Sequence, residues 1–240
     1  MEGTQWVRSV LTTAVVFPAP VFAVFVLNNL VAALCGSIAA LPAWAVLVVF
    51  LLWAIVTLPS IVLGAVLGKN RHRRFYAPVA TNKYAREIPP QPWYTRAAPQ
   101  VLLAGLLPFA GIYVELHYVL ASAWSHKTYA VFPILAVLFA TLLLTTAGAG
   151  VVMTYFLLDA EDHRWWWRAF AGGAAVGGYT MAYSVLWFHV HSRMSGVLQL
   201  LTYFSYNALG SLAIAIVLGT VSWRASLAFL RTVYRAIKSD

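Results

Sequence analysis

The sequence predicts an all-α membrane protein, a polytopic bundle of six transmembrane helices. Of the 240 residues, 62% are hydrophobic and only 10% are charged, whereas soluble domains are about half apolar and about a quarter charged. A soluble fold with so few charges could not cover its surface, so the apolar residues must face something other than water. The apolar stretches lack a sustained period-two alternation, which favours helices over an outer-membrane barrel.

Six stretches are long and apolar enough to cross a hydrocarbon core of about 30 Å, which needs roughly 20 helical residues. The predicted spans cover residues 10–34, 42–67, 101–123, 130–158, 169–188 and 197–222. Prolines within the spans each remove a helical hydrogen bond and favour a kink; they are Pro18, Pro20, Pro59, Pro108 and Pro133. The remaining long segments are a loop at 69–99 and a tail at 223–240.

The basic residues are distributed unevenly between the two sides of the predicted bundle. With six spans, all 16 Lys and Arg residues except Lys127 and Arg193 fall on the side that holds both termini and the long loop. Basic residues concentrate in the cytosolic segments of membrane proteins, so both ends of the chain are predicted to be cytosolic. The net charge of +9 is thus explained by topology, and no nucleic-acid partner is expected.

The 69–99 loop opens with a basic run and continues as a proline-rich segment. The run at 69–74 has two interpretations, a topology signal that needs no ligand or a site for anionic lipid head groups. Residues 88–94 contain three prolines and favour an extended backbone. We expect this segment to lie as a stiff strap across the cytosolic face.

Glu115 is the one acidic residue well inside a predicted span. A charged side chain at the bilayer centre costs roughly 3 kcal/mol on insertion scales, so it is expected to face the bundle or a hydrated cavity. Four histidines are predicted near the same side and raise the hypothesis of zinc binding or proton relay; they are His117, His126, His189 and His191. No recognised ligand spacing joins them, and a structural carboxyl is the simpler interpretation. No metal or cofactor is therefore assigned, and the single cysteine excludes an intrachain disulfide.

The junction between the fourth and fifth spans, residues 159–168, combines acidic, aromatic and basic side chains. Its carboxylates are expected to pair with neighbouring arginines while three tryptophans lie at the membrane interface, which makes an anchored turn. Catalysis is unconvincing here because the block lacks a nucleophile, a phosphate-binding glycine loop and an oxyanion site. We therefore predict a structural clamp and no enzyme activity.

Small residues repeat at intervals of four on the fifth span, at Ala169, Gly173 and Gly177. This spacing lets another helix approach the backbone closely. Two interpretations stay open: packing within the bundle, and recognition of a transmembrane helix of another protein.

Several separate blocks of the chain match one family pattern. The junction contributes Glu161, Asp162, Trp165, Trp166, Trp167 and Arg168, with His163 where tyrosine is usual. The loop and the spans contribute Thr81-Asn82, Arg86, Ile88-Pro89, Gln91, Trp93-Tyr94-Thr95, Leu107-Pro108-Phe109, Glu115-Leu116, Tyr203-Phe204, Tyr206 and Gly219-Thr220. In this order the blocks resemble the nonaspanins, or transmembrane 9 superfamily. Departures from the pattern are Ser205, Ser222 and Arg224.

The resemblance implies a membrane domain equivalent to the last six of nine spans, without the family's large lumenal amino-terminal domain. It also implies residence in the Golgi and endosomes and assistance in the sorting of other membrane proteins, with client transmembrane proteins and membrane lipids as partners. Lys238 and Asp240 are similar to the family's terminal signal for retrieval by the COPI coat. A free carboxyl end on the cytosolic side suits such a receptor-read signal.

A rival interpretation is a transporter or channel. It would use Glu115 and the proline-containing spans to carry a proton or a small solute, as intramembrane carboxylates do in transporters.

Overall fold

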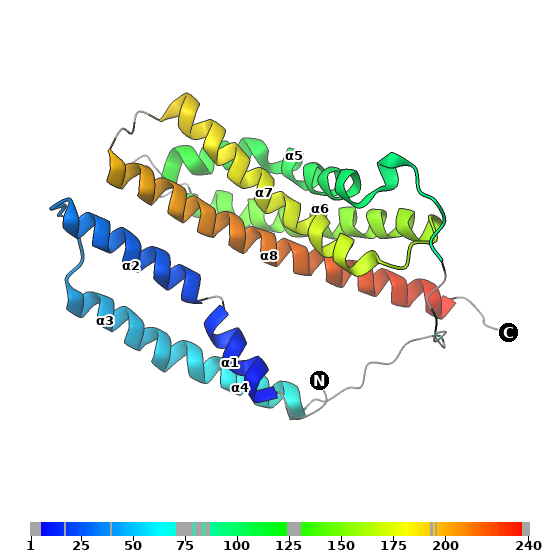
Figure 1. Cartoon of the computed structure of the whole chain (residues 1–240), viewed down its shortest axis with the longest axis horizontal. Coiled ribbons are helices and arrows are strands. Elements are labelled where there is room, and N and C mark those ends of the chain that lie inside the picture. Colours follow the sequence, from blue (N-terminus) through cyan, green and yellow to red (C-terminus); the bar gives the residue numbers. More distant parts are fainter. Residues whose placement is uncertain are drawn as a thin grey trace. The chain divides into compact units, whose positions relative to one another are not determined.

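A computed structural model describes residues 6–16, 18–38, 40–70, 79, 84, 87–123, 131–192, 194 and 196–236. Within these ranges all regular structure is helical, which confirms the predicted fold class. The helices in Figure 1 are α1 (Trp6–Val16), α2 (Pro18–Leu34), α3 (Ala43–Leu52), α4 (Leu58–Asn70), α5 (Ala97–Ala123), α6 (Val131–Asp159), α7 (Trp165–His191) and α8 (Val197–Ala236). A π-helical turn, η1 (Trp53–Thr57), joins α3 to α4, and a 3-10 turn, η2 (Trp93–Thr95), precedes α5.

Five helical segments of the described chain are long and apolar enough to cross a membrane, rather than the six that were predicted. They are Val7–Leu34, Ala43–Asn70, Ala97–Ser122, Phe132–Asp159 and Val197–Ala236. The predicted span at 169–188 does form a helix, α7, but α7 is not among the five. Its glycine, hydroxyl and histidine residues take the place of leucines and valines and lower its hydropathy.

The α8 helix is longer than the predicted span at 197–222. It comprises 40 residues and continues to Ala236, so much of the predicted tail is helical. At 1.5 Å per residue it measures roughly 60 Å, about twice the thickness of a hydrocarbon core. One end of α8 therefore extends beyond the bilayer.

The chain divides into two compact units. The first comprises Met1–Tyr76 and Arg193–Leu209 and holds α1 to α4 with the start of α8. Within it, Asn28 Nδ2 on α2 donates a hydrogen bond to Ser205 Oγ on α8 at 2.8 Å. The helices α3 and α4 and the turn η1 contain no buried residue, so their apolar side chains are largely exposed.

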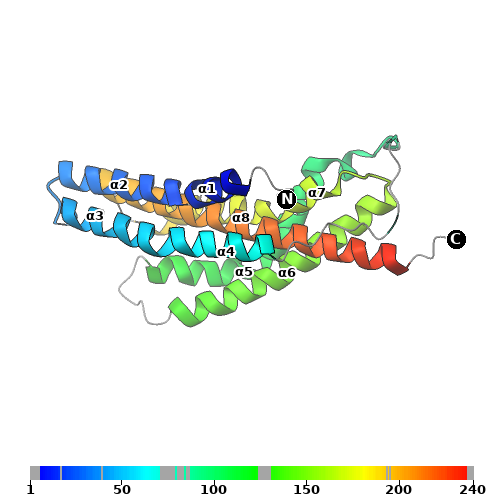
Figure 2. The same ribbon diagram turned by 90° about the horizontal axis from the view of Figure 1, so that it is seen from below.

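Two prolines account for the interruptions in the helices of the first unit. Pro18 begins α2, where its missing N–H needs no helical partner. Pro59 lies just after η1. A proline ring clashes with the carbonyl four residues earlier, and the wider π turn relieves that clash. Figure 2 shows that α3 and α4 nevertheless continue as one rod.

The second unit comprises Ala77–Ser192 and Gly210–Asp240 and holds α5, α6, α7 and the rest of α8. Helix α5 packs against both α6 and α7 (Figures 1 and 2). The main buried cluster contains Ile112, Leu138, Leu142, Val176 and Leu218. A second cluster, Met153, Leu157 and Ala169, lies where α6 ends and α7 begins, and it supports the candidate site.

Candidate functional site

The turn between α6 and α7 begins with a tight helix end. Glu161 has a left-handed backbone conformation, with φ of 54°, and the Asp162 N–H donates to the Leu157 carbonyl at 2.9 Å. This is the pattern of a Schellman motif, in which glycine usually holds the left-handed position. The turn brings Asp162 to the start of α7.

Asp162 is the buried carboxylate of the site, with a fully covered side chain. Its Oδ1 accepts hydrogen bonds from the backbone N–H of Arg164 at 3.0 Å and from Arg164 Nε at 3.3 Å. Its Oδ2 accepts one from Arg168 Nη2 at 2.6 Å. Burial acts to raise the pKa of Asp162, but the hydrogen bonds from Arg164 and the charges of Arg168 and Arg164 outweigh it and lower the pKa. Asp162 is therefore ionised at neutral pH.

Arg168 joins this turn to the segment that precedes α5. Besides binding the aspartate, its Nη1 donates to the Thr95 carbonyl at 3.1 Å and to Gln100 Oε1 at 2.9 Å. In parallel, Gln91 Nε2 donates to the Ala160 carbonyl at 2.8 Å. We define the clasp as Gln91, Thr95, Gln100, Ala160, Asp162 and Arg168. It fastens the described end of the proline-rich segment to the α6–α7 turn.

The three tryptophans of the junction have different environments. Trp165 is half-buried and packs on the second buried cluster, whereas Trp166 and Trp167 are 41% and 72% exposed. Two of the indoles are therefore accessible from outside the bundle. The first instead anchors the turn to the bundle.

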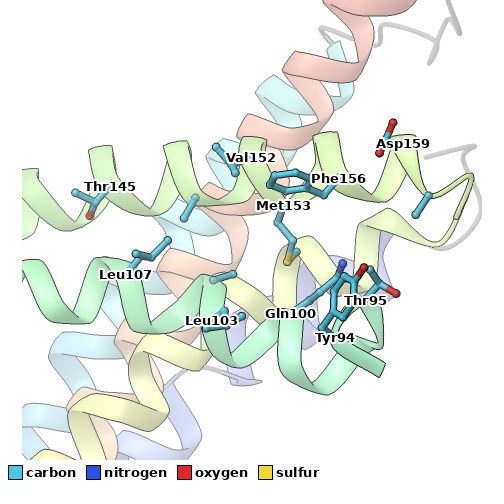
Figure 3. Close-up of a pocket in the computed structure, with 13 residues that line it drawn as sticks. Tyr94, Thr95, Gln100, Leu103, Leu107, Thr145, Val152, Met153, Phe156 and Asp159 are labelled. Atoms are coloured by element: carbon cyan, nitrogen blue, oxygen red, sulfur yellow. The ribbon is translucent and has the colours of Figure 1, made fainter. Parts of the chain in front are cut away.

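A cavity of about 690 Å³ lies beside the clasp, between α5, α6 and η2 (Figure 3). Its walls are mainly apolar side chains of α5 and α6. Thr95, Gln100 and Ala160 belong to both the cavity wall and the clasp. The clasp therefore shapes one end of the cavity, whose volume is within the range of small-molecule sites, about 300–1,000 Å³.

Glu115 is half-buried on α5 and makes no hydrogen bond or ion pair with the other described residues. His117 Nδ1 lies 3.2 Å from the Tyr183 hydroxyl, and the His117 ring lies 5.1 Å from that of His191. The structure thus brings two of the predicted histidines together without Glu115; His126 is outside the described residues. Within the described ranges, no three His, Cys, Asp or Glu residues are grouped so as to hold a metal ion.

The small residues of α7 lie against other parts of the second unit. A Cβ at Gly173 would collide with the Leu218 carbonyl of α8, and one at Gly177 would collide with Ala215. Ala169 is fully buried in the second cluster. The face predicted for helix contact is therefore occupied within the chain.

Sequence reasoning missed Gln100 of the clasp and four small residues of α8. Gln100 had no signal beyond being a polar residue at the start of an apolar helix. On α8, small residues share the face that meets α6 and α7, and their spacing could have been recognised; they are Ser211, Ala215, Ser222 and Ser226. Ser226 Oγ also accepts a buried hydrogen bond from Thr154 Oγ1 at 2.8 Å.

The sorting signal predicted at Lys238 and Asp240 lies outside the described residues, since α8 is described to Ala236. The basic residues at 71–74 lie outside them as well.

Comparison with known proteins identifies relatives over the full chain. A sequence model of the family Endomembrane protein 70 matches residues 1–197, a range that includes the whole clasp. The chain is 44% identical over 240 residues to Transmembrane 9 superfamily member 4 of Arabidopsis thaliana, which covers 100% of this chain and 40% of that protein. No solved structure matches the chain.

Two further relatives come from distant organisms. The chain is 38% identical over 238 residues to Transmembrane 9 superfamily member 1 of Mus musculus, covering 99% of the chain and 39% of that protein. It is 39% identical over 240 residues to Putative phagocytic receptor 1b of Dictyostelium discoideum, covering 100% and 41%. The chain therefore spans about 40% of the length of the curated relatives it matches.

Proposed function

The chain belongs to the transmembrane 9 superfamily, the Endomembrane protein 70 family, and from this premise we propose that it assists the sorting and localisation of other membrane proteins. It is a multi-span helical membrane protein. One relative of similar sequence bears the name Putative phagocytic receptor 1b. Because the chain spans about 40% of the length of its relatives, the role is proposed for this membrane portion itself.

The observation that carries the proposal is an open small-residue face on α4. Gly64 and Gly68 stand four residues apart, and within the first unit no heavy atom outside the neighbouring backbone of α4 lies within 4 Å of the Cβ position at either glycine. In the second unit, the equally spaced Gly173 and Gly177 are filled by α8. Helix α4 thus offers a transmembrane helix of another protein the close contact that α7 makes inside the chain.

The clasp supports a structural role for Asp162 and Arg168, which belong to the family pattern at the α6–α7 junction; the junction residues of that pattern are called the signature below. Asp162 and Arg168 bind each other, and Nη1 of Arg168 also donates to Thr95 of η2 and to Gln100 of α5. These charged groups hold the α6–α7 turn, η2 and α5 together, so their role is structural. We infer from this that the signature stabilises a membrane platform and catalyses no reaction.

The test is rescue of membrane-protein localisation in cells depleted of their own family members. We expect the wild-type chain to restore the surface abundance of a set of membrane proteins, measured by surface biotinylation and mass spectrometry. The pair Gly64→Leu with Gly68→Leu should lose most of this rescue while reaching the same compartment. Gly148→Leu is the matched control because Gly148, on α6, also has no neighbour within 4 Å. Equal rescue by both variants would refute the α4 contact.

We further propose that the chain resides in the Golgi and endosomes and is retrieved by the COPI coat through Lys238 and Asp240. The similarity of these residues to the family signal supports this proposal. Lys238→Ala with Asp240→Ala should shift an amino-terminally tagged chain out of the Golgi, as seen by co-localisation microscopy. Ser239→Ala is the control, and an unchanged distribution of the double variant would contradict the signal.

For the orientation, we propose that α7 also crosses the bilayer, inside the bundle, so that both termini are cytosolic. The helix has 27 residues, and its small and hydroxyl side chains are buried against neighbouring helices. Such burial makes high hydropathy unnecessary for crossing. The concentration of basic residues on one side supports the same orientation.

A further inference from the structure

We propose that the cavity beside the clasp binds a membrane phospholipid with a cationic amine head group. Its acyl chain would lie between α5 and α6, and its head group would lie at Asp159. The inference rests on the membrane placement of α5 and α6 and is independent of the sorting role.

The apolar part of the cavity lies within two membrane-spanning segments. Leu103 and Leu107 of α5 and Val152 of α6 line it and are 60%, 67% and 53% exposed, so this part opens sideways. Along α6 the lining extends from Thr145 to Asp159, roughly 21 Å at 1.5 Å per residue. One leaflet of a hydrocarbon core is about 15 Å deep. The cavity therefore has the depth of one leaflet together with its head-group region.

The two ends of the cavity differ in polarity. Figure 3 shows Leu107 and Thr145 at one end and Tyr94, Thr95 and Asp159 at the other. The Thr145 hydroxyl donates to the Thr141 carbonyl of its own helix at 2.8 Å, so its polar group is already satisfied. The polar end is thus the one next to the clasp, where α6 leaves its membrane-spanning segment. An amphipathic lipid matches this gradient.

Charge complementarity selects the head group. Among the residues that line the cavity, Asp159 is the only acidic or basic one. Phe156 lies three residues earlier on the same face of α6, and Tyr94 supplies a second ring from η2. A carboxyl group and aromatic rings that line the same end of a cavity each attract an ammonium group. An anionic head group would instead meet an unfavourable charge.

The clasp supplies a donor for the phosphate or ester oxygens of the same lipid. Gln100 Oε1 accepts a hydrogen bond from Arg168 at 2.9 Å. The Gln100 amide nitrogen carries two further donors, which make no hydrogen bond to the other described residues. Because the oxygen faces Arg168, the Gln100 nitrogen is the group available to a ligand in the cavity that it lines. The signature arginine thereby sets the polarity of the lipid site.

The experiment uses the 240-residue chain in vesicles that contain phosphatidylcholine, phosphatidylethanolamine and phosphatidylglycerol in equal amounts. A trace of photoactivatable phosphatidylethanolamine or phosphatidylglycerol, with identical diazirine-labelled acyl chains, is crosslinked and mapped by peptide mass spectrometry. We expect the phosphatidylethanolamine probe to label the peptides of 100–107 and 149–159 at least fivefold more than the phosphatidylglycerol probe. Equal labelling of these peptides by the two probes would overturn the proposal, and this comparison needs no variant to fold.

Variants then separate the two halves of the site. Val152→Phe fills the groove and should lower labelling by both probes at least threefold, whereas Leu144→Phe, on α6 outside the cavity, should not. Asp159→Asn should abolish the preference for the amine lipid and keep the total labelling. Glu161→Gln, a nearby carboxyl outside the cavity wall, should keep the preference. Equal labelling of the two phenylalanine variants, or a preference unchanged in Asp159→Asn, would overturn the assignment.

Discussion

The ion pair between Asp162 and Arg168 is nearly buried, with side chains that are 0% and 13% exposed. Removing one member of such a pair leaves an uncompensated charge and costs about 3–5 kcal/mol. We therefore expect Arg168→Gln to lower the free energy of unfolding by about 3 kcal/mol, measured by denaturation in detergent micelles. The control is Arg164→Gln, because Arg164 is 58% exposed and should cost no more than about 1 kcal/mol. Similar losses in the two variants would contradict the clasp.

The same aspartate sets a pH dependence. Its pKa in the folded chain lies below the ordinary value of 3.8. A group with a lowered pKa stabilises the fold above its unfolded pKa, and this contribution is lost as the pH falls through the folded pKa. We expect the stability supplied by Asp162 to be constant above about pH 5 and to decline at lower pH. Asp162→Asn should be less stable at neutral pH and should show a smaller decline in acid, measured as unfolding midpoints across pH. An equal decline in acid for Asp162→Asn and the wild-type chain would contradict this assignment.

Glu115 provides the residue-level test of the rival transporter. Because Glu115 makes no hydrogen bond or ion pair with the other described residues and forms no three-residue group with the histidines, we expect Glu115→Gln to leave proton flux into proteoliposomes unchanged. Flux would be followed with a pH-sensitive dye, with empty vesicles as the baseline. Flux in the wild-type chain that disappears in Glu115→Gln would favour the transporter over the sorting role.

At the scale of helices, the composition of α7 follows from its place in the second unit. Its glycines let α8 approach the backbone, and a side chain there would displace α8. We expect Gly173→Leu to lower the free energy of unfolding of the second unit by about 1–3 kcal/mol, the usual cost of overpacking. Gly178→Leu is the matched control on the same helix, since no described atom lies within 4 Å of its Cβ position. Thermal unfolding in micelles compares them, and equal midpoints would contradict the α7–α8 contact.

The same contact explains why α7 is not among the five strongly apolar helical segments. A helix that faces lipid needs apolar side chains all round, whereas nine residues of α7 are buried against protein. Small and hydroxyl residues are tolerated there because their neighbours are other helices. A helix in the interior of a bundle can therefore be less apolar than its peers.

For the whole molecule, the proposed orientation has a direct test. Glycosylation acceptor sites inserted in the α5–α6 and α7–α8 connections should be modified in microsomes, because both would face the lumen. Sites placed at the two termini and in the 71–86 segment should stay unmodified. Modification of one terminus alone would show that the chain crosses an odd number of times, and it would also remove the cytosolic placement of Lys238 and Asp240.

The sequence by itself determined the membrane class, the helical fold, the family and the position of the signature turn. These follow from local properties, namely apolar runs long enough to span lipid and blocks of adjacent residues. Even the pairing within the junction was accessible, because Asp162 and Arg168 lie close along the chain.

Only the tertiary structure decided what the small residues of α7 contact, that Arg168 binds Thr95 and Gln100, and where a cavity opens between α5 and α6. Each of these depends on residues far apart in the sequence. Small residues at every fourth position indicate that another helix can approach closely, but they do not indicate which helix it is. The structure shows that this helix is α8.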